Sequence, residues 1–473
     1  MARNRHTQNN GFIMSTLEEL VPQDHLVRKL EEYIDWDFIY DICDPLYSTK
    51  GTNRIDPVVL FKLMFINIIF GIHSMRRTCQ EAEVNVAYRW FLGLNFGEKI
   101  PDHSTFSQNY ARKFRNDNTA IRIFEYFIKV LMENDIVDPS VVYVDGTHLK
   151  ANANKNKYET REIQIAAKRY QKELDEEIDR DRAEHFKKEL KRKKKELQDT
   201  KDVKVSQNDP DCGYFHKGDK EKCFAYNVNA SCDKHGYILG MSLDAGNIHD
   251  SVAFYHIKDY MDYLYGDTVE TYVADSGYST APICHDVESS GQEMIVPYKR
   301  VGAKRKGFYK KYQYRYDKEN EVYVCPMGCP LTYSTTTRDG KRQYRSNGKQ
   351  CESCPKIEKC TTSKNHTKVI ERHVWEEARE EAIKKQKSEE GKEIYEQRKQ
   401  SIERVFGDGK RRHGLDYTLY RGYERVYDHT ILTFTGMNMK KLCTYYGKLE
   451  EKYAQKSGFE HQNEEVKKAI GIE

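Results

Sequence analysis

The chain has 473 residues, of which 32% are charged and 38% hydrophobic, and its formal net charge is +4. The length predicts two to four domains, and 34 tyrosines and 19 phenylalanines supply core material that a disordered chain lacks. The small net charge excludes a uniformly basic nucleic-acid-binding protein, so any nucleic-acid surface must come from local basic patches.

The sequence contains no feature that predicts export or membrane insertion. Residues 1–20 include basic side chains but no apolar signal-peptide core. The most apolar run, 57–72, is too short to span a bilayer and contains Lys62, which favours a buried helix. Twelve cysteines in such a chain are not expected to form a disulfide framework. We therefore expect a cytoplasmic protein without membrane contacts.

Residues 1–135 are predicted to form a helical domain. Apolar residues recur at helical spacing within 25–46, 57–72 and 119–132. The same region carries a set of basic residues: Arg76, Arg77, Arg112, Lys113 and Arg115. They are compatible with a DNA-binding face and equally with a solvated surface.

Two strand-like runs end in an aspartate followed closely by glycine. Residues 141–144 are β-branched or aromatic and precede Asp145, and the run in 270–280 ends at Asp275 in the same way. A carboxylate at the end of a buried strand is costly unless it caps a turn, pairs with a cation or holds a metal.

The segments around these two runs predict a mixed α/β domain. A highly charged stretch, about 160–200, is predicted to be a long helix or helical hairpin that projects from the body. Strands are predicted again within 223–246 and 292–300, with helices between the later strands. Ligand sites in such sheets form beyond the carboxyl ends of parallel strands, where Asp145 and Asp275 would both lie.

A third carboxylate, Glu403, lies in a stretch with a helical pattern, 393–414. Its predicted buried side contains Ile394, Ile402, Val405 and Phe406. Carboxylate oxygens suit Mg²⁺ or Mn²⁺. Two such ions can activate a nucleophile and stabilise a leaving oxygen in a phosphoryl displacement.

The motifs "VDGT", "ADSGY" and "IERVFGDGK" follow one another as in the catalytic signature of DDE-type bacterial insertion-sequence transposases, which this chain resembles. "PDHSTF", "GNIHDS" and the cysteine-rich segment resemble the same branch. The resemblance implies a ribonuclease H-like α/β fold, a mixed sheet flanked by helices, with an N-terminal helical domain and a cysteine-rich β insertion. It places the first aspartate on the first strand, the second just after the fourth, and the glutamate on a late helix.

The domains expected from this resemblance are four. They are an N-terminal helical, DNA-binding domain (1–135), the first part of the catalytic core (136–300, with the charged insertion at about 160–200), a basic, aromatic and cysteine-rich insertion (301–390), and the C-terminal part of the core with the glutamate-bearing helix (391–473).

The same transposase branch carries a Tyr-x2-Arg-x3-Glu-x6-Lys signature. Tyr395, Arg398, Glu403 and Lys410 match it, except that four residues separate Arg398 from Glu403. On a continuous helix the extra residue would turn Arg398 from about 40° to roughly 140° away from the glutamate. Lys399 would then take the usual position. The residues expected to position DNA are Tyr395, Arg398, Lys399, Arg404 and Lys410.

The resemblance implies a transposase that cuts the ends of its insertion sequence and joins them to target DNA. Asp145, Asp275 and Glu403 would hold two Mg²⁺ (or Mn²⁺) ions; one would activate water to free a 3′-hydroxyl, which then attacks target DNA. The partners would be double-stranded DNA, as terminal inverted repeats and target, and a second copy of the chain. The alternative is a non-catalytic zinc-containing DNA-binding protein or an inactive transposase remnant, which the retention of all three carboxylates disfavours.

Five cysteines, at 325, 329, 351, 354 and 360, have spacings typical of structural zinc sites, which take four ligands. Unliganded cysteines packed in a small β-rich module are the alternative. The resemblance implies Cys325, Cys351, Cys354 and Cys360 as the zinc ligands and leaves Cys329 spare.

The stretch 299–318 and Asp250 each allow two interpretations. The stretch 299–318 interleaves Lys and Arg with tyrosines, which suits contacts to phosphates and bases but also a hairpin with packed aromatic rings. Asp250, with Ser251, is expected to cap the following helix; a fourth metal-site carboxylate is the alternative.

Overall fold

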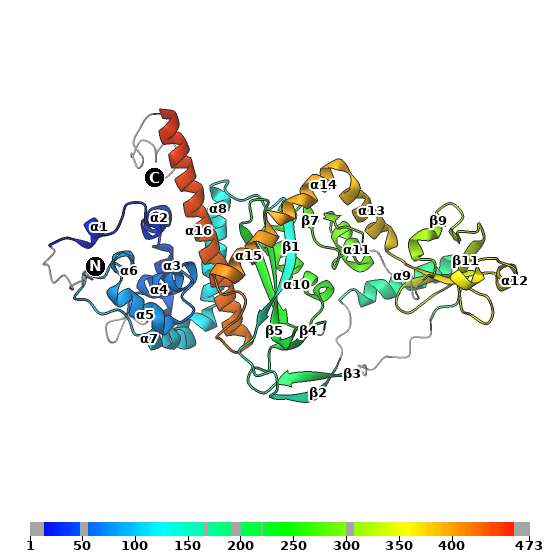
Figure 1. Ribbon diagram of the computed structural model, residues 1–473, viewed down its shortest axis with the longest axis horizontal. Coiled ribbons are helices and arrows are strands. Elements are labelled where there is room, and N and C mark those ends of the chain that lie inside the picture. The colour runs from blue at the N-terminus through cyan, green and yellow to red at the C-terminus, as the bar shows by residue number, and fades with distance from the viewer. Residues whose placement is uncertain are drawn as a thin grey trace, which may run out of the picture. The chain divides into compact units, whose positions relative to one another are not determined.

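The computed structural model describes residues 14–47, 55–164, 169–190, 200–218, 221–298 and 307–457. The chain divides into two compact units, each built from separated segments. The first unit contains Met1–Val137, His148–Ala153 and Arg404–Glu473, and the second contains Asp138–Thr147 and Asn154–Glu403. Helices and sheets together make a mixed α/β protein, as predicted (Figure 1).

The first unit is mainly helical. Asp56 accepts a hydrogen bond from the Val58 N–H at the start of α4, and Pro57 occupies the first turn, where a missing N–H costs nothing. Nearly every residue of α4 is buried, and Lys62 is neutralised by Glu31, with 2.6 Å between Nζ and Oε2. The helices that precede the central sheet are α1 (Leu17–Leu20), α2 (Leu26–Tyr33), α3 (Phe38–Cys43), η1 (Asp44–Leu46), α4 (Pro57–Ile69), α5 (Met75–Val84), α6 (Val86–Leu92), α7 (His103–Asn109), η2 (Tyr110–Phe114), η3 (Arg115–Asp117) and α8 (Thr119–Glu133).

The long C-terminal helix α16 (Tyr423–Ser457) belongs to this helical unit. It packs on α2, α4 and α8, and the hydroxyl of Tyr110 bonds to Asp428 Oδ2 at 2.6 Å. Residues 391–473 were expected to lie together in the catalytic core, but the structure divides them after Glu403. The apolar residues of α16, such as Phe434 and Met439, are buried among the N-terminal helices instead. No helix within the described ranges is long and apolar enough to cross a membrane.

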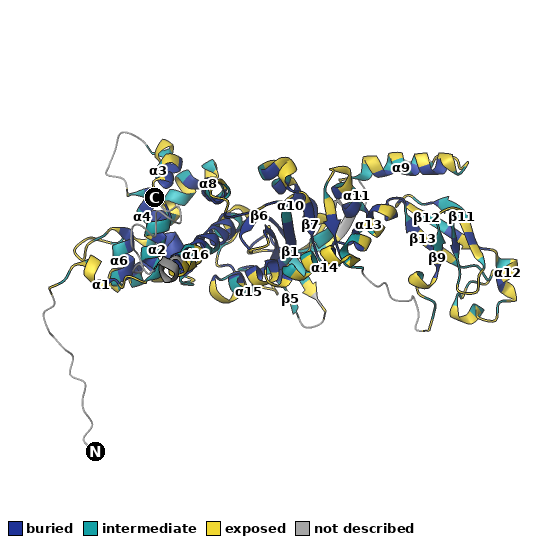
Figure 2. Cartoon of the chain, turned by 90° about the horizontal axis from the view of Figure 1, so that it is seen from above, coloured by how far each residue is buried: buried dark blue, intermediate teal, exposed yellow. Residues whose placement is uncertain are grey.

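The second unit contains the central six-stranded sheet. Its order is β4-β5-β1-β7-β8, and β6 also pairs with β5, beyond the part that pairs with β4. β1, β7 and β8 are parallel, whereas β4 and β6 run antiparallel to β5. The buried faces of these strands form the dark core of the sheet in Figure 2. The elements are β1 (Val141–Lys150), β4 (Gly213–Lys217), β5 (Glu221–Cys232), β6 (Ile238–Ala245), α10 (Asp250–Tyr265), η4 (Gly266–Thr268), β7 (Thr271–Val273), α11 (Ala281–Ser289) and β8 (Glu293–Ile295).

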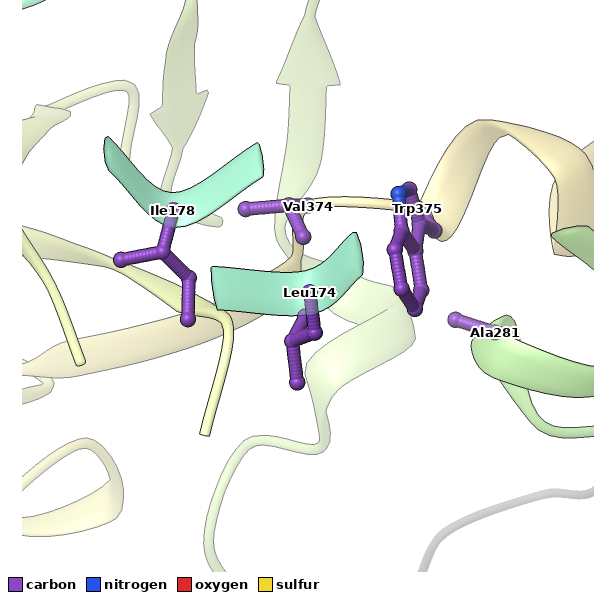
Figure 3. Packing of buried hydrophobic residues seen from close by; sticks show 5 residues of the cluster. All are labelled: Leu174, Ile178, Ala281, Val374 and Trp375. Atoms are coloured by element: carbon purple, nitrogen blue, oxygen red, sulfur yellow. The ribbon is translucent and has the colours of Figure 1, made fainter. Parts of the chain in front are cut away.

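The charged stretch at 160–200 forms a short packed helix, not a long projecting one, within its described part. Strands β2 (Tyr158–Gln164) and β3 (Thr200–Ser206) pair with each other, and α9 (Gln171–Glu184) lies between them in sequence. Leu174 and Ile178, one turn apart on α9, pack with Ala281, Val374 and Trp375 (Figure 3). This apolar pair anchors the helix. Residues 165–168 and 191–199 lie outside the described part.

A five-stranded antiparallel sheet contains the cysteine-rich segment, in the order β13-β12-β11-β10-β9. Tyr314, Tyr323 and Tyr344 form its core with Leu331 and Ile370. Tyr314 therefore supports the packed-hairpin interpretation, whereas Tyr312 is 57% exposed; residues 299–306 are outside the description. The elements are η5 (Lys311–Gln313), β9 (Arg315–Asp317), β10 (Val322–Val324), β11 (Pro330–Thr336), β12 (Lys341–Ser346), α12 (Gly348–Glu352), η6 (Ile357–Lys359) and β13 (Val369–His373).

Candidate active site

The parallel pairing of β1 and β7 places Asp145 beside Asp275. Tyr143 is the register partner of Val273, so each aspartate lies two residues beyond this pair on its own chain. Side chains two residues apart point to the same face of a strand, and neighbouring strands lie about 4.8 Å apart. The two carboxylates therefore meet at the same edge and on the same face of the sheet.

Each aspartate uses one oxygen to accept a hydrogen bond from a nearby glycine N–H. The Gly146 N–H donates to Asp145 Oδ1 at 2.9 Å, and the Gly277 N–H donates to Asp275 Oδ1 at 2.6 Å. The turn role considered for these residues holds for Asp275, which precedes the turn at 276–278, whereas Asp145 lies within β1, which continues to Lys150. Asp145 Oδ2 instead lies 2.9 Å from Nη2 of Arg398.

Arg398 links Asp145 to Glu403. The segment between them is not one continuous helix: α14 (Glu389–Glu396) is followed by the 3₁₀ turn η7 (Gln397–Lys399), and α15 (Ile402–Arg412) begins anew. The expected rotation of Arg398 away from Glu403 was therefore wrong. Arg398 is 4% exposed, and its Nη1 lies 3.8 Å from Glu403 Oε1. Lys399, the expected substitute, is exposed.

The electrostatics of this site favour a bound cation. Burial raises the pKa of Asp145 to about 6, Arg398 and the Gly146 N–H oppose that rise, and the charges of Asp275 and Glu403 add to it. Three carboxylates thus face a single guanidinium. Among the described residues, no three His, Cys, Asp or Glu side chains stand close enough together to hold a metal ion. The oxygens suit a hard divalent ion chemically, but Arg398 now lies between two of the carboxylates.

The remaining members of the expected DNA-positioning set lie on two helices. Tyr395 is on α14, and the Arg398 guanidinium lies 5.8 Å from the centre of its ring. Lys410 lies seven residues after Glu403 on α15, so both point to nearly the same side of that helix. Arg404, on the same helix, has a 74% exposed side chain.

A buried cluster of oxygens behind Gly146 was not anticipated from the sequence. Asn227 and Asn229 alternate along β5, and with Tyr278 they are almost fully buried. The Asn227 Oδ1, Asn229 Oδ1 and Tyr278 hydroxyl have no hydrogen-bond partner. The sequence signal for this cluster is the pair of asparagines two residues apart in a mostly apolar strand. A buried amide in such a strand needs a polar partner, so the pair indicates a buried polar cluster.

Asp250 is bound to this cluster and does not cap α10. Asn227 Nδ2 donates to Asp250 Oδ1 at 3.2 Å, and the cap of α10 is His249, whose Nδ1 accepts from the Ser251 N–H at 3.1 Å. Asp250 therefore does not supply the expected helix cap.

Gly146→Ala is expected to lower the free energy of unfolding by about 1–3 kcal/mol, the usual effect of overpacking. A Cβ at this position would lie 2.9 Å from Asn229 Oδ1 and 3.2 Å from the Tyr278 hydroxyl. The matched control is Gly407→Ala on α15, where a Cβ meets nothing within 4 Å and should stabilise the helix by up to about 1 kcal/mol. Urea unfolding of both variants measures the difference; equal stabilities would contradict tight packing behind Gly146.

The five clustered cysteines line one small pocket of the five-stranded sheet. The Cys329 N–H lies 3.3 Å from Cys325 Sγ, and the Tyr314 hydroxyl lies 3.2 Å from Cys360 Sγ. The pKa of Cys360 is raised, chiefly by burial, with Cys325 and Cys351 contributing. None of the twelve cysteines, all of which lie in the described ranges, is joined in a disulfide in this structure.

The fold and the acidic edge of the sheet define a mixed α/β protein with a carboxylate-rich candidate catalytic site. Comparison with known families adds two matches: residues 324–443 match a family described as transposase DDE domain, and residues 15–112 match one described as transposase domain (DUF772). Together these matches indicate that the chain is an insertion-sequence transposase of the DDE type. The first match includes Arg398, Glu403 and the clustered cysteines.

The other two comparisons add little. No curated protein matches the chain. Among solved structures, it is similar to the one titled "Cryo-EM structure of piggyBac transposase synaptic complex with hairpin DNA", with 7% sequence identity and a TM-score of 0.33. That alignment covers 94% of this chain and 76% of the other. A likeness at this level supports no inference about the present protein.

Proposed function

We propose that this transposase cuts the ends of an insertion sequence and joins them to target DNA, with Asp145, Asp275 and Glu403 as its catalytic carboxylates. The observation that carries the proposal is the meeting of these residues, which are far apart in sequence, around Arg398. Asp145 and Asp275 share a strand edge, and Glu403 reaches the same guanidinium as Asp145. Carboxylates that converge in this way, with the pKa of the buried Asp145 raised, are typical of functional sites.

The order of elements supports a ribonuclease H-like core. In chain order, counted without β4, the strands of the central sheet follow as β1, β5, β6, β7 and β8. Asp145 is then on the first strand, Asp275 follows the fourth, and Glu403 is on the later helix α15. These are the three positions that the resemblance implies.

The three carboxylates would hold two Mg²⁺ or Mn²⁺ ions. When bound, such ions supply activation of water and stabilisation of the leaving oxygen. Arg398 occupies the space between Asp145 and Glu403, so it would have to move aside for a shared ion and would then be free to contact a DNA phosphate. Its fork of donors suits a phosphate as well as a carboxylate.

Double-stranded DNA is the proposed substrate. Tyr395, Arg398, Lys399, Arg404 and Lys410 would position the cleaved end, and the N-terminal helical domain, 1–135, would bind the terminal repeats. Bringing two ends together requires a homodimer in the DNA complex.

A cleavage assay on DNA that carries the element's terminal inverted repeats tests this function. We expect Mg²⁺-dependent nicking, followed by joining of the 3′-end to a target plasmid. Binding without nicking would favour the non-catalytic DNA-binding alternative, and nicking without joining would favour a plain endonuclease.

We also propose that Cys325, Cys351, Cys354 and Cys360 bind a structural zinc ion. Their shared pocket supports this, although the sulfurs would have to draw closer than they stand now. Metal analysis of purified protein should give one zinc per chain, and Cys354→Ser should lose it while Cys329→Ser keeps it. Fully folded protein without zinc would reject this ligand set.

A further inference from the structure

An open pocket lies between the five-stranded sheet and α13 (Glu376–Lys387), within the second unit. Its volume is about 490 Å³, which falls in the range of roughly 300–1,000 Å³ typical of small-ligand sites. None of the carboxylates assigned above lines it. Two features of its wall are relevant, namely five tyrosines (298, 312, 314, 316 and 323) and four cationic side chains (Lys311, Arg379, Lys384 and Lys387).

Three tyrosines of the aromatic wall pack in the sheet, and Tyr312 is exposed. Tyr314 and Tyr323 are each 4% exposed and belong to the core of the sheet, and the Tyr316 ring packs on Tyr323 with 4.9 Å between centroids. Tyr312, on the 3₁₀ turn η5, is 57% exposed. Lys310 Nζ lies 5.9 Å from the centre of the Tyr312 ring, and the exposed part of that ring can accept a ligand.

The opposite wall carries excess positive charge. Both pocket carboxylates are already paired: Glu376 with Lys311 and Arg379, and Glu380 with Arg372. The Nε–H of Arg379 is buried and has no acceptor. Lys384 and Lys387 are exposed on the last turns of α13, and the ion pair of Lys384 with Glu381 is a surface pair of small energy.

An exposed tyrosine ring beside two exposed lysines suits a base with its phosphate. Bases stack on aromatic side chains irrespective of sequence, and lysines bind the backbone phosphate. A base inside a duplex cannot present its face to Tyr312, because both of its faces are stacked on neighbouring bases. The ligand must therefore be a nucleotide outside a base-paired stack.

We propose that this pocket binds one unpaired nucleotide of the DNA substrate, with its base on Tyr312 and its phosphate near Lys384 and Lys387. The proposal rests on the proposed function only in taking DNA as the substrate. It adds a second contact to DNA, separate from the carboxylate site, that selects unpaired over paired strands.

Fluorescence anisotropy with the full chain tests the pocket in EDTA, where no cleavage occurs. The probes are a short labelled single strand of mixed sequence and the blunt duplex of the same sequence. Tyr312→Ala should weaken single-strand binding about tenfold and leave duplex binding unchanged, whereas Tyr312→Phe should bind like the wild type. Lys387→Ala should reduce the salt dependence of single-strand binding by about one phosphate contact. The control is Tyr263→Ala on α10, which removes a 76% exposed tyrosine that does not line the pocket.

Unchanged single-strand binding by Tyr312→Ala, or an equal loss for the single strand and the duplex, would overturn the proposal. Because the readout is binding in EDTA, it is independent of catalysis. If the wild-type protein never nicked DNA, but Tyr312→Ala still weakened single-strand binding, the pocket proposal would stand and the proposed transposase activity would be rejected.

Discussion

Replacing Glu403 with glutamine is expected to reduce Mg²⁺-dependent cleavage of terminal-repeat DNA by at least about a hundred- to a thousandfold, an effect of the size seen when one electrostatic group is removed from a catalytic site. The amide keeps the size of the side chain but loses the negative charge that a divalent ion requires. DNA binding should be retained, because Glu403 makes no favourable contact with a phosphate. Single-turnover nicking, together with an anisotropy measurement of DNA binding, separates the two effects.

The matched control for this variant is Glu396→Gln, which alters an exposed glutamate at the end of α14, seven residues earlier. It should nick DNA at the wild-type rate. If Glu403→Gln nicked at that rate as well, Glu403 would have no part in the chemistry. Equal loss in both variants would indicate a general effect of charge.

Arg398→Ala is expected to lower the free energy of unfolding by about 3 kcal/mol in the absence of divalent ions. The substitution leaves Asp145 buried beside Asp275 and Glu403 without its cation. The pKa of Asp145, already raised by burial, should rise further. An Asp145 carboxyl whose pKa is higher in the folded than in the unfolded protein stabilises the fold at low pH, where the carboxyl is protonated. That stability is lost as the pH increases through the folded-state pKa. The variant's deficit should therefore be small near pH 4 and largest above pH 6, the value near which Asp145 titrates in the wild type.

Denaturant unfolding at several pH values measures this dependence. Arg404→Ala removes a neighbouring arginine whose side chain is 74% exposed, and it should change stability by less than about 0.5 kcal/mol. A deficit in Arg398→Ala that did not vary with pH would show that the lost contribution is packing of the guanidinium, not compensation of the Asp145 charge.

The two aspartates could be predicted from the sequence because their positions depend on local rules. A β-branched run followed by Asp-Gly is recognisable by itself, and the parallel pairing of β1 with β7 then brings the two aspartates together. The expected strand end at Asp145 was wrong, because β1 continues to Lys150. Glu403 could be placed on a helix for the same reason.

Features that depend on breaks in regular structure could not be predicted. The sequence around Arg398 has a continuous helical pattern, yet Ser401 Oγ donates to the Gln397 carbonyl oxygen at 2.9 Å, and the chain makes a 3₁₀ turn before α15. That turn returns Arg398 to the carboxylates, so Lys399 does not take the place of Arg398 beside Glu403. On a continuous helix, the extra residue in the signature indicated that Arg398 points away from Glu403.

Tertiary packing decided the remaining differences. The apolar residues of α16 pack on α4 and α8, which are more than 280 residues earlier in the chain, and periodicity does not specify such a partner. Leu174 and Ile178 are recognisable in the sequence as an apolar side of α9, but their partners Val374 and Trp375 are distant in sequence. Similarly, the Asn227, Asn229 and Tyr278 cluster forms only when β5 lies beside β1 and the turn after β7 closes over both.

The most direct test of the proposed chemistry is an experimental structure with Mn²⁺, in which anomalous scattering locates the ions. We expect Mn²⁺ bound by Asp145, Asp275 and Glu403 at about 2.0–2.2 Å, with the Arg398 guanidinium displaced from between Asp145 and Glu403. Saturating Mn²⁺ that left no anomalous peak there, with Arg398 still on Asp145, would contradict a metal-dependent site at these carboxylates.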